Sequence, residues 1–376
     1  MAIEVREFAA GDVPSIDRLN GRLAAGGQPH RVGALDVDRV ERQRREAMPI
    51  RARLYVAAEE DEIRGTVWLR EQCFWSDGGA IRAGWAVYPV AESLVNGQAA
   101  GVPASLLFKL RREQPHLMAL GMGGHTGSFA KLLAAARWPG SLVPFFFRIL
   151  RPSRVLRRLA YARSTRVRRL VADGLAYSGA AWAANNVLTA ARAAVGRGTR
   201  RPSTATAVDR FGDWADAIWD RSRRSYGLIA FRDSGSLNAL YPDDFNRLTR
   251  LRVQVHGDDI GWACVRAIDA AGTWFERQFG DLRVGIITDA LAPPADATTV
   301  IDAAVRHLAA DGVDLIVTFQ SHPAWGEAAL NAGLLRGPSN CAFYRSPSVD
   351  AVIRNAASDH RHCHLTYSDG DGPERV

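Results

Sequence analysis

The chain contains 376 residues, of which 47% are hydrophobic and 23% are charged. This is the composition of a globular protein, so it excludes a chain that is disordered throughout. At roughly 150 residues per domain, the length predicts two or three domains. The N-terminus lacks the apolar core of a signal peptide, and the four cysteines lie far apart without a CxxC pair. We therefore expect a cytoplasmic protein with neither a metal site nor a disulfide framework.

The first 150 residues alternate between strand-like and helix-like patterns. The alternating N-terminus predicts a strand at residues 3–8, and Asp12 followed by Pro14 predicts the start of a helix. Two β-rich runs around an acidic turn predict a hairpin. The other expected elements are a helix at 36–48, strands at 54–58, 63–69, 81–90 and 117–122, and helices at 102–112 and 128–138.

Residues 151–205 are rich in arginine. Thirteen arginines and one acid, Asp173, lie between residues 148 and 201, giving that segment +12 in a chain of net charge +8. Apolar residues share one helical face, so we predict a basic helical linker whose residues 151–170 contact an anionic membrane, or else a solvated or domain-packing helix. Tyr161 is the only aromatic residue among residues 151–170, which does not favour nucleic acid as a partner. The apolar run 174–191 is broken by Asn185 and Asn186, so it does not predict a membrane span.

The second half repeats the outline of the first. We expect helices at 213–224, 297–310 and 324–332, and strands at 251–255, 261–268, 282–288, 315–319 and 341–345. The order of hairpin, strand, helix, strand and helix therefore occurs twice. The sequence predicts an α/β fold with α+β layers, in which two mixed-sheet domains, 1–150 and 206–376, are joined by the linker 151–205.

A loop of small residues lies between a strand and a helix in the first half. Residues 87–90 (Val-Tyr-Pro-Val) end the strand, and residues 98–107 (Gln-Ala-Ala-Gly-Val-Pro-Ala-Ser-Leu-Leu) open the helix. This arrangement resembles the GNAT acyltransferases, whose Gln/Arg-x-x-Gly-x-Gly/Ala loop holds the pyrophosphate of coenzyme A on N–H groups at a helix N-terminus. Pro103 departs from that pattern. The resemblance implies acetyl-CoA or another acyl-CoA as co-substrate, bound by Val87, Gln98, Gly101, Val102 and Ala104.

The same resemblance indicates where the chemistry would occur. GNAT enzymes hold the pantetheine arm in a splayed strand pair, which corresponds here to residues 84–87 and 117–122. Many members carry a tyrosine on the next helix that protonates the leaving thiolate, but no tyrosine lies between residues 117 and 150. Glu92 is the candidate general base and His125, in a glycine-rich loop, is a second candidate for proton transfer. The alternatives are a solvated loop acid and a surface histidine.

The second half resembles the GNAT pattern less completely. Its would-be phosphate loop, residues 291–298, contains no glycine and carries Asp296, so we expect no CoA binding there. Residues 232–241, 261–266 and 364–371 resemble bacterial tandem-GNAT proteins found with exopolysaccharide biosynthesis. That resemblance suggests Asp233 and Tyr241 as contacts to a sugar or amine, although residues 242–244 also form a good helix-starting turn.

The function implied by these resemblances is transfer of an acetyl or other acyl group from acyl-CoA to an amine. The acceptor would be an amino sugar or another precursor of a surface polysaccharide. Two alternatives stay open. One is a Fem-type aminoacyl transferase, which would use charged tRNA instead of CoA. The other is a non-catalytic scaffold or ligand-binding protein with GNAT-like domains.

Overall fold

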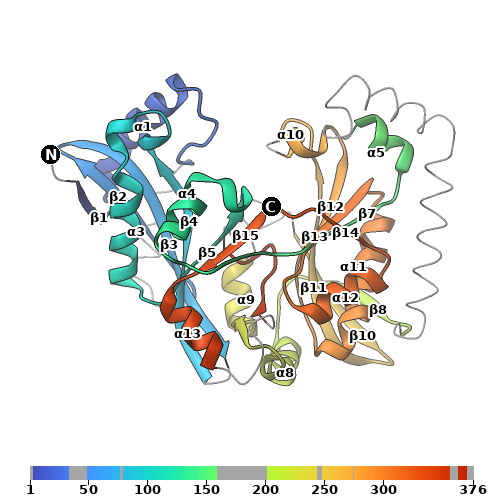
Figure 1. Ribbon diagram of the computed structural model, residues 1–376. Helices are drawn as coiled ribbons and strands as arrows, with labels where there is room; N and C mark the ends of the chain where they lie inside the picture. The colour runs from blue at the N-terminus through green and yellow to red at the C-terminus, as the bar shows by residue number, and fades with distance from the viewer. Residues whose placement is uncertain are drawn as a thin grey trace.

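The computed structural model describes residues 3–33, 49–76, 79–158, 201–243, 248–273, 275–355 and 363–370. The helix expected at 36–48 and most of the linker, residues 159–200, lie outside the described residues. In Figure 1 the described part consists of two sheets, one built mainly from each half of the chain.

The first sheet is mostly antiparallel, with one parallel pair at its centre. Its order is β1 (Glu4–Glu7), β2 (Arg51–Glu59), β3 (Glu62–Ser76), β4 (Gly79–Ala91), β5 (Leu117–Met122), β15 (Cys341–Arg345) and β6 (Gly140–Leu142). Strands β4 and β5 form this central parallel pair. Two short strands, β9 (Leu228–Ala230) and β16 (Cys363–His364), extend the sheet beside β3 and also pair in parallel with each other.

The second sheet has the same plan. Its order is β14 (Leu335–Gly337), β7 (Phe145–Ile149), β13 (Leu315–Phe319), β12 (Arg283–Leu291), β11 (Asp258–Asp269), β10 (Thr249–Val255) and β8 (Thr204–Val208). Strands β12 and β13 are parallel and the other pairs of this sheet are antiparallel.

Helices cover the sheets because each carries an apolar face. In the first half, α1 (Val13–Ala25), α3 (Val102–Glu113) and α4 (Ser128–Ala135) bury leucines against the sheet. In the second half, α11 (Ala297–Ala310) buries valines, Ile301 and Leu308, and α12 (Pro323–Asn331) buries Trp325 and two alanines. The other helices are α5 (Pro152–Arg158), α8 (Asp213–Ser222), α9 (Ser234–Leu240), α10 (Glu276–Phe279) and α13 (Pro347–Asn355).

Each sheet includes a strand from the other half of the chain. Strand β7, from the first half, lies between β13 and β14, and β15, from the second half, lies between β5 and β6. The predicted boundaries at 150 and 206 therefore divide the chain in sequence, but the strands on either side of them do not all belong to separate sheets. An apolar core that includes Met118, Leu120, Phe319 and Leu365 fills the space between the two sheets.

A pair of glycines shows how closely the two halves match. A Cβ on Gly65 of β3 would lie 2.6 Å from Val102 at the start of α3, and one on Gly261 of β11 would lie 2.6 Å from Val300 of α11. Both contacts are shorter than a real Cβ allows, so only glycine permits each helix to pack this closely on its sheet.

Candidate functional site

Strands β4 and β5 separate soon after they meet. They pair at two positions, Gly84–Leu117 and Trp85–Met118, although both strands continue beyond them. In the part of the chain that the structure describes, no other strand pairs with this edge of β4. We call the wedge between residues 86–91 and 119–122 the first split, and Val87 lies in it. This is the splayed geometry that the GNAT resemblance implied.

A bulge in β4 accompanies the separation. The β3–β4 register shifts between Thr66 and Trp68, which places both Tyr88 and Pro89 opposite Val67. Tyr88 has φ = +48°, a left-handed conformation that L-residues seldom adopt. The extra residue bends β4 and increases its twist, which directs the strand away from β5.

Helix α3 begins next to the first split. Gly101 is its N-cap, and Ser105 N donates to Gly101 O at 3.0 Å. This is the first hydrogen bond of the helix. The N–H groups of Val102 and Ala104 come before it in the first turn, so no carbonyl group within the helix accepts from them. Gln98, Gly101 and Ala104 are exposed. The loop therefore presents backbone donors, with the positive end of the helix dipole behind them.

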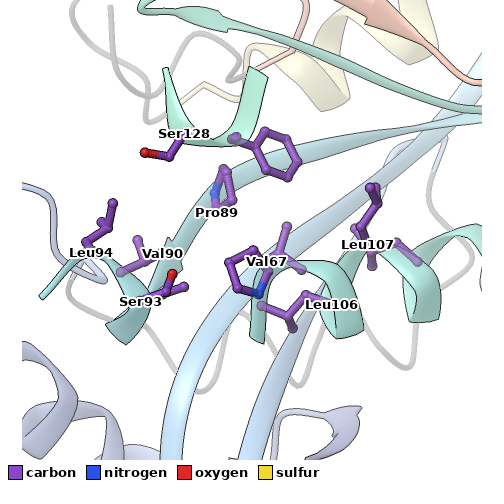
Figure 2. A pocket seen from close by; sticks show the side chains of 12 residues that line it. Val67, Pro89, Val90, Ser93, Leu94, Leu106, Leu107 and Ser128 are labelled. Carbon is purple, nitrogen blue, oxygen red and sulfur yellow. The ribbon is translucent and has the colours of Figure 1, made fainter. Parts of the chain in front are cut away.

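A cavity of about 530 Å³, including its part open to solvent, lies between α3, β4 and α4. Figure 2 shows Ser128 of α4 on one side of it and Leu106 and Leu107 of α3 on another, with Pro89 and Val90 of β4 between them. An anion here would meet the N-terminal ends of two helices, and an apolar arm would lie on the leucines. The other lining residues are Val67, Ala91, Ser93, Leu94, Pro103, Leu110 and Phe129.

Glu92 follows β4 but makes the contacts of a structural residue. Its carboxylate lies 3.0 Å from Arg22 Nε and 3.1 Å from Arg64 Nη1, and its side chain is 4% exposed. Burial alone would raise the pKa of Glu92, but the hydrogen bonds from Asn96 and Arg64 and the charges of both arginines outweigh it and lower the pKa. A carboxylate held in this way is a weak base, so the geometry does not favour the expected role of Glu92.

His125 lies on an exposed turn between β5 and α4 and has a partner that sequence reasoning missed. Its Nδ1 is 2.7 Å from the hydroxyl of Tyr344, on the exchanged strand β15. Burial raises the pKa of Tyr344, so its hydroxyl stays protonated at neutral pH. Residues 117–150 contain no tyrosine, whereas Tyr344 is 219 positions from His125 along the chain. The two residues meet only because β15, from the second half of the chain, pairs with β5 in the first sheet.

Strands β12 and β13 also separate, after three paired positions that end at Ile286–Val317. We call this wedge, between residues 288–292 and 318–321, the second split. Residues 363–370, which we call the tail, lie in it. On the β12 side, Ser368 Oγ donates to Thr288 O at 3.1 Å and His364 Nε2 contacts Ala290 O at 2.8 Å. The second split is therefore filled by protein.

Buried charges fix the tail in place. Arg232 Nε lies 2.8 Å from Asp289 Oδ2, and Arg232 Nη2 lies 3.0 Å from Asp369 Oδ1. All three side chains are at most 1% exposed. Burial raises the pKa of Asp289, Arg232 opposes this rise, and the charge of Asp369 adds to it.

The two residues expected to contact an acceptor belong to this framework. The Tyr241 hydroxyl lies 2.9 Å from Asp289 Oδ2 and 2.5 Å from Ser368 Oγ, and its side chain is fully buried. Asp233 Oδ1 accepts from Ser236 N at 2.7 Å and so caps α9. This placement does not support substrate contact by either residue.

The described start of the basic linker packs on the second sheet. Val155 of α5 is buried, Arg154 of α5 and the preceding Arg151 pair with Asp314, and Arg158 pairs with Asp281. Every helix among the described residues is too short or too polar to cross a membrane. Within the same residues, no group of three or more His, Cys, Asp or Glu side chains is placed to hold a metal ion.

The architecture matches solved structures at low sequence identity. A GCN5-related N-acetyltransferase from Anabaena variabilis has a TM-score of 0.53 at 8% identity, covering 92% of this chain and 73% of its own. An Enterococcus faecalis protein of unknown function named as an N-acyltransferase has a TM-score of 0.51 at 10% identity, covering 92% and 72%. A Pyrococcus horikoshii protein named as an acetyltransferase has a TM-score of 0.50 at 10% identity, covering 97% and 93%.

These matches span both halves of the chain, and at such identities they show the fold alone. The protein thus has a mixed α/β architecture of the GNAT type, with two mixed sheets. No model of a known protein family matches the sequence, and no curated protein matches it either.

Proposed function

We propose that the protein transfers an acetyl or other acyl group from acyl-CoA to an amine, and that the acyl-CoA binds in the first split. The observation that supports this most is the position of the split beside the N-terminus of α3. Donors at Gly101, Val102 and Ala104 would receive the pyrophosphate, with Gln98 beside them. The edge of β4 at Val87 would bind the pantetheine arm.

The proposed reaction needs little more than position and proton transfer. The neutral amine attacks the thioester carbonyl carbon and forms the C–N bond, the C–S bond breaks, the nitrogen gives up one proton, and the CoA thiolate takes one. Orientation in the split and backbone donors to the carbonyl oxygen would supply most of the acceleration. We assign the proton transfer to His125 and Tyr344, because their hydrogen bond joins the end of β5 to β15 beside the split.

An amino sugar or another surface-polysaccharide precursor is the acceptor that we propose by resemblance. Of the residues that carried that resemblance, Arg232, Tyr241 and His364 are buried in the core. We expect other residues to contact the acceptor.

Calorimetric titration with acetyl-CoA tests the site. Gln98→Glu with Gly101→Asp places two negative charges at the phosphate position, and a Cβ on Gly101 has 3.7 Å to its nearest neighbour, so the fold should tolerate the change. We expect Kd to rise by at least about 100-fold, or ~2.7 kcal/mol. Gly21→Asp, at an exposed helical glycine with nothing within 4 Å, is the matched control.

Several outcomes would reject the proposal. Absence of heat and of a thermal shift at millimolar CoA would reject acyl-CoA binding. Binding of charged tRNA without CoA would favour the aminoacyl transferase instead. If CoA binds but His125→Gln and Tyr344→Phe leave kcat within twofold of His116→Gln, the assigned pair has no role. We expect both variants to lose about 100-fold in kcat with KM unchanged.

Contact of residues 151–170 with an anionic membrane is a separate part of the proposal. The charge of +12 over residues 148–201 supports it, although Arg154 and Arg158 of α5 already pair with Asp314 and Asp281, which precede β13 and β12. Co-sedimentation with phosphatidylserine vesicles tests it, with phosphatidylcholine vesicles as the control. Equal binding to both would exclude an electrostatic contact.

A further inference from the structure

The tail contacts both edges of the second split, as a bound peptide would. Thr288 O and Ala290 O on β12 accept from tail side chains. On the other edge, Ser321 N donates to Leu365 O at 3.2 Å, and Leu365 N donates to Ser321 Oγ at 2.7 Å. Buried backbone groups must find partners, and here the tail supplies them in place of a neighbouring strand.

Side chains of the tail complete the contact. Thr366 Oγ1 lies 3.1 Å from Asp289 Oδ1, and Thr366 N donates to Asp369 Oδ2 at 2.9 Å. The ring of His364 stacks on Tyr226 at 4.9 Å and lies 5.2 Å from the ring of Trp325. The tail therefore combines backbone pairing, an aromatic slot and a buried ion pair.

In the second half, the helix start that corresponds to the phosphate loop of the first half is also covered by protein. The helix after β12 is α11, and Thr298 and Thr299 in its first turn are buried, whereas Gly101 and Ala104 at α3 are exposed. Arg201 pairs with Asp296 at this helix start. Protein thus occupies both places that an acyl-CoA would need in the second half.

We propose that the tail is an intramolecular peptide ligand of the second split, held where an acyl-CoA arm would otherwise lie. The occupant is a segment of the same chain, so its effective concentration is high and a free arm cannot compete with it. The chain then binds at most one acyl-CoA, in the first split.

Cutting the chain ahead of the tail tests the proposal on the full-length protein. A protease recognition sequence placed between residues 356 and 362 allows cleavage after folding, and native mass spectrometry at micromolar concentration measures whether residues 363–376 stay bound. We expect retention, and a tenfold or greater loss of retention in Thr366→Val with Ser368→Ala. Tyr367→Phe removes a tail hydroxyl but keeps the ring against Phe319, so it is the matched control.

Dissociation of the unmutated tail from a protein that stays folded would overturn the proposal. If the double variant fails to fold, hydrogen exchange compared between the uncut and the cut chain decides the question. The Ser321 amide donates to Leu365 O of the tail at 3.2 Å, so it should exchange slowly only while the tail is in place. Both measurements omit CoA, so they stand even if the proposed function fails. Two acyl-CoA molecules bound per intact chain would also overturn the proposal.

Discussion

The first and second splits have the same backbone arrangement, but only the second is filled by a segment of the chain. In each, a parallel strand pair opens after two or three paired positions, and a helix starts beside the opening. The first split borders a cavity and an exposed loop of backbone donors. The second holds the tail, and the start of its helix is covered. The two halves share a fold, so a few side chains and one chain segment decide whether each half can bind a ligand.

The largest expected effect comes from breaking the ion pair that fixes the tail. Asp289→Ala leaves Arg232 buried beside one acid instead of two, and removal of one partner from a buried pair typically costs about 3–5 kcal/mol. Urea unfolding measures the loss. Asp243→Ala removes an exposed carboxylate that lies 3.6 Å from Arg210, so it should cost at most about 0.5 kcal/mol. Equal losses in the two variants would show that the second split is not held by its charges.

As the pH falls, the second split should lose stability at a higher pH than the first. Burial lowers the pKa of His364 from 6.5 to about 4. Between those values the unfolded chain binds a proton that the folded chain does not, so the free energy of unfolding falls as pH falls, by about 3 kcal/mol in all. Unfolding curves from pH 7 to 4 should lose this slope in His364→Phe. The slope should persist in His256→Phe, at an exposed turn. A slope unchanged in both variants would exclude His364 as its source.

The sequence predicted much of the fold and less of the site. The bounds of β5, α11, β13 and β15 agree with those predicted, because strong apolar patterns define them. Local patterns do not determine which sheet a strand joins, so the exchange of β7 and β15 was not predicted. For the same reason Tyr344 was missed. The start of α3 after Gly101 agrees with the predicted helix because its signals are local, whereas acyl-CoA binding at this loop stays a prediction. Tyr241 has a residue type suited to binding, but only the fold shows that it is buried.

The tail also connects the two splits, through Gly370. This glycine has φ = +63°, and a Cβ on it would lie 2.5 Å from Leu120 Cβ and 2.6 Å from Leu120 O on β5. Gly370→Ala should therefore cost about 2 kcal/mol and also weaken acyl-CoA binding, because β5 is one wall of the first split. Gly272→Ala has a similar φ, +72°, but nothing within 4 Å, so it should cost about 1 kcal/mol and leave binding unchanged. If acyl-CoA binding is unchanged in both variants, the tail does not couple the second split to the first.

The smallest effect concerns Glu92, at the edge of the first split. Glu92→Gln removes the charge between Arg22 and Arg64 but keeps the shape, so we expect a loss of about 1 kcal/mol of stability and a kcat within twofold of wild type. The pKa of Glu92 is lowered from 4.5 in the folded protein, so its contribution is present above pH 4.5 and disappears as pH falls through the folded pKa. Glu62→Gln, which breaks the more exposed pair with Arg22, is the control. A kcat lowered 100-fold in Glu92→Gln alone would make Glu92 the general base. The first split would then contain its own catalytic carboxylate, and it would differ from the second in chemistry as well as in being open.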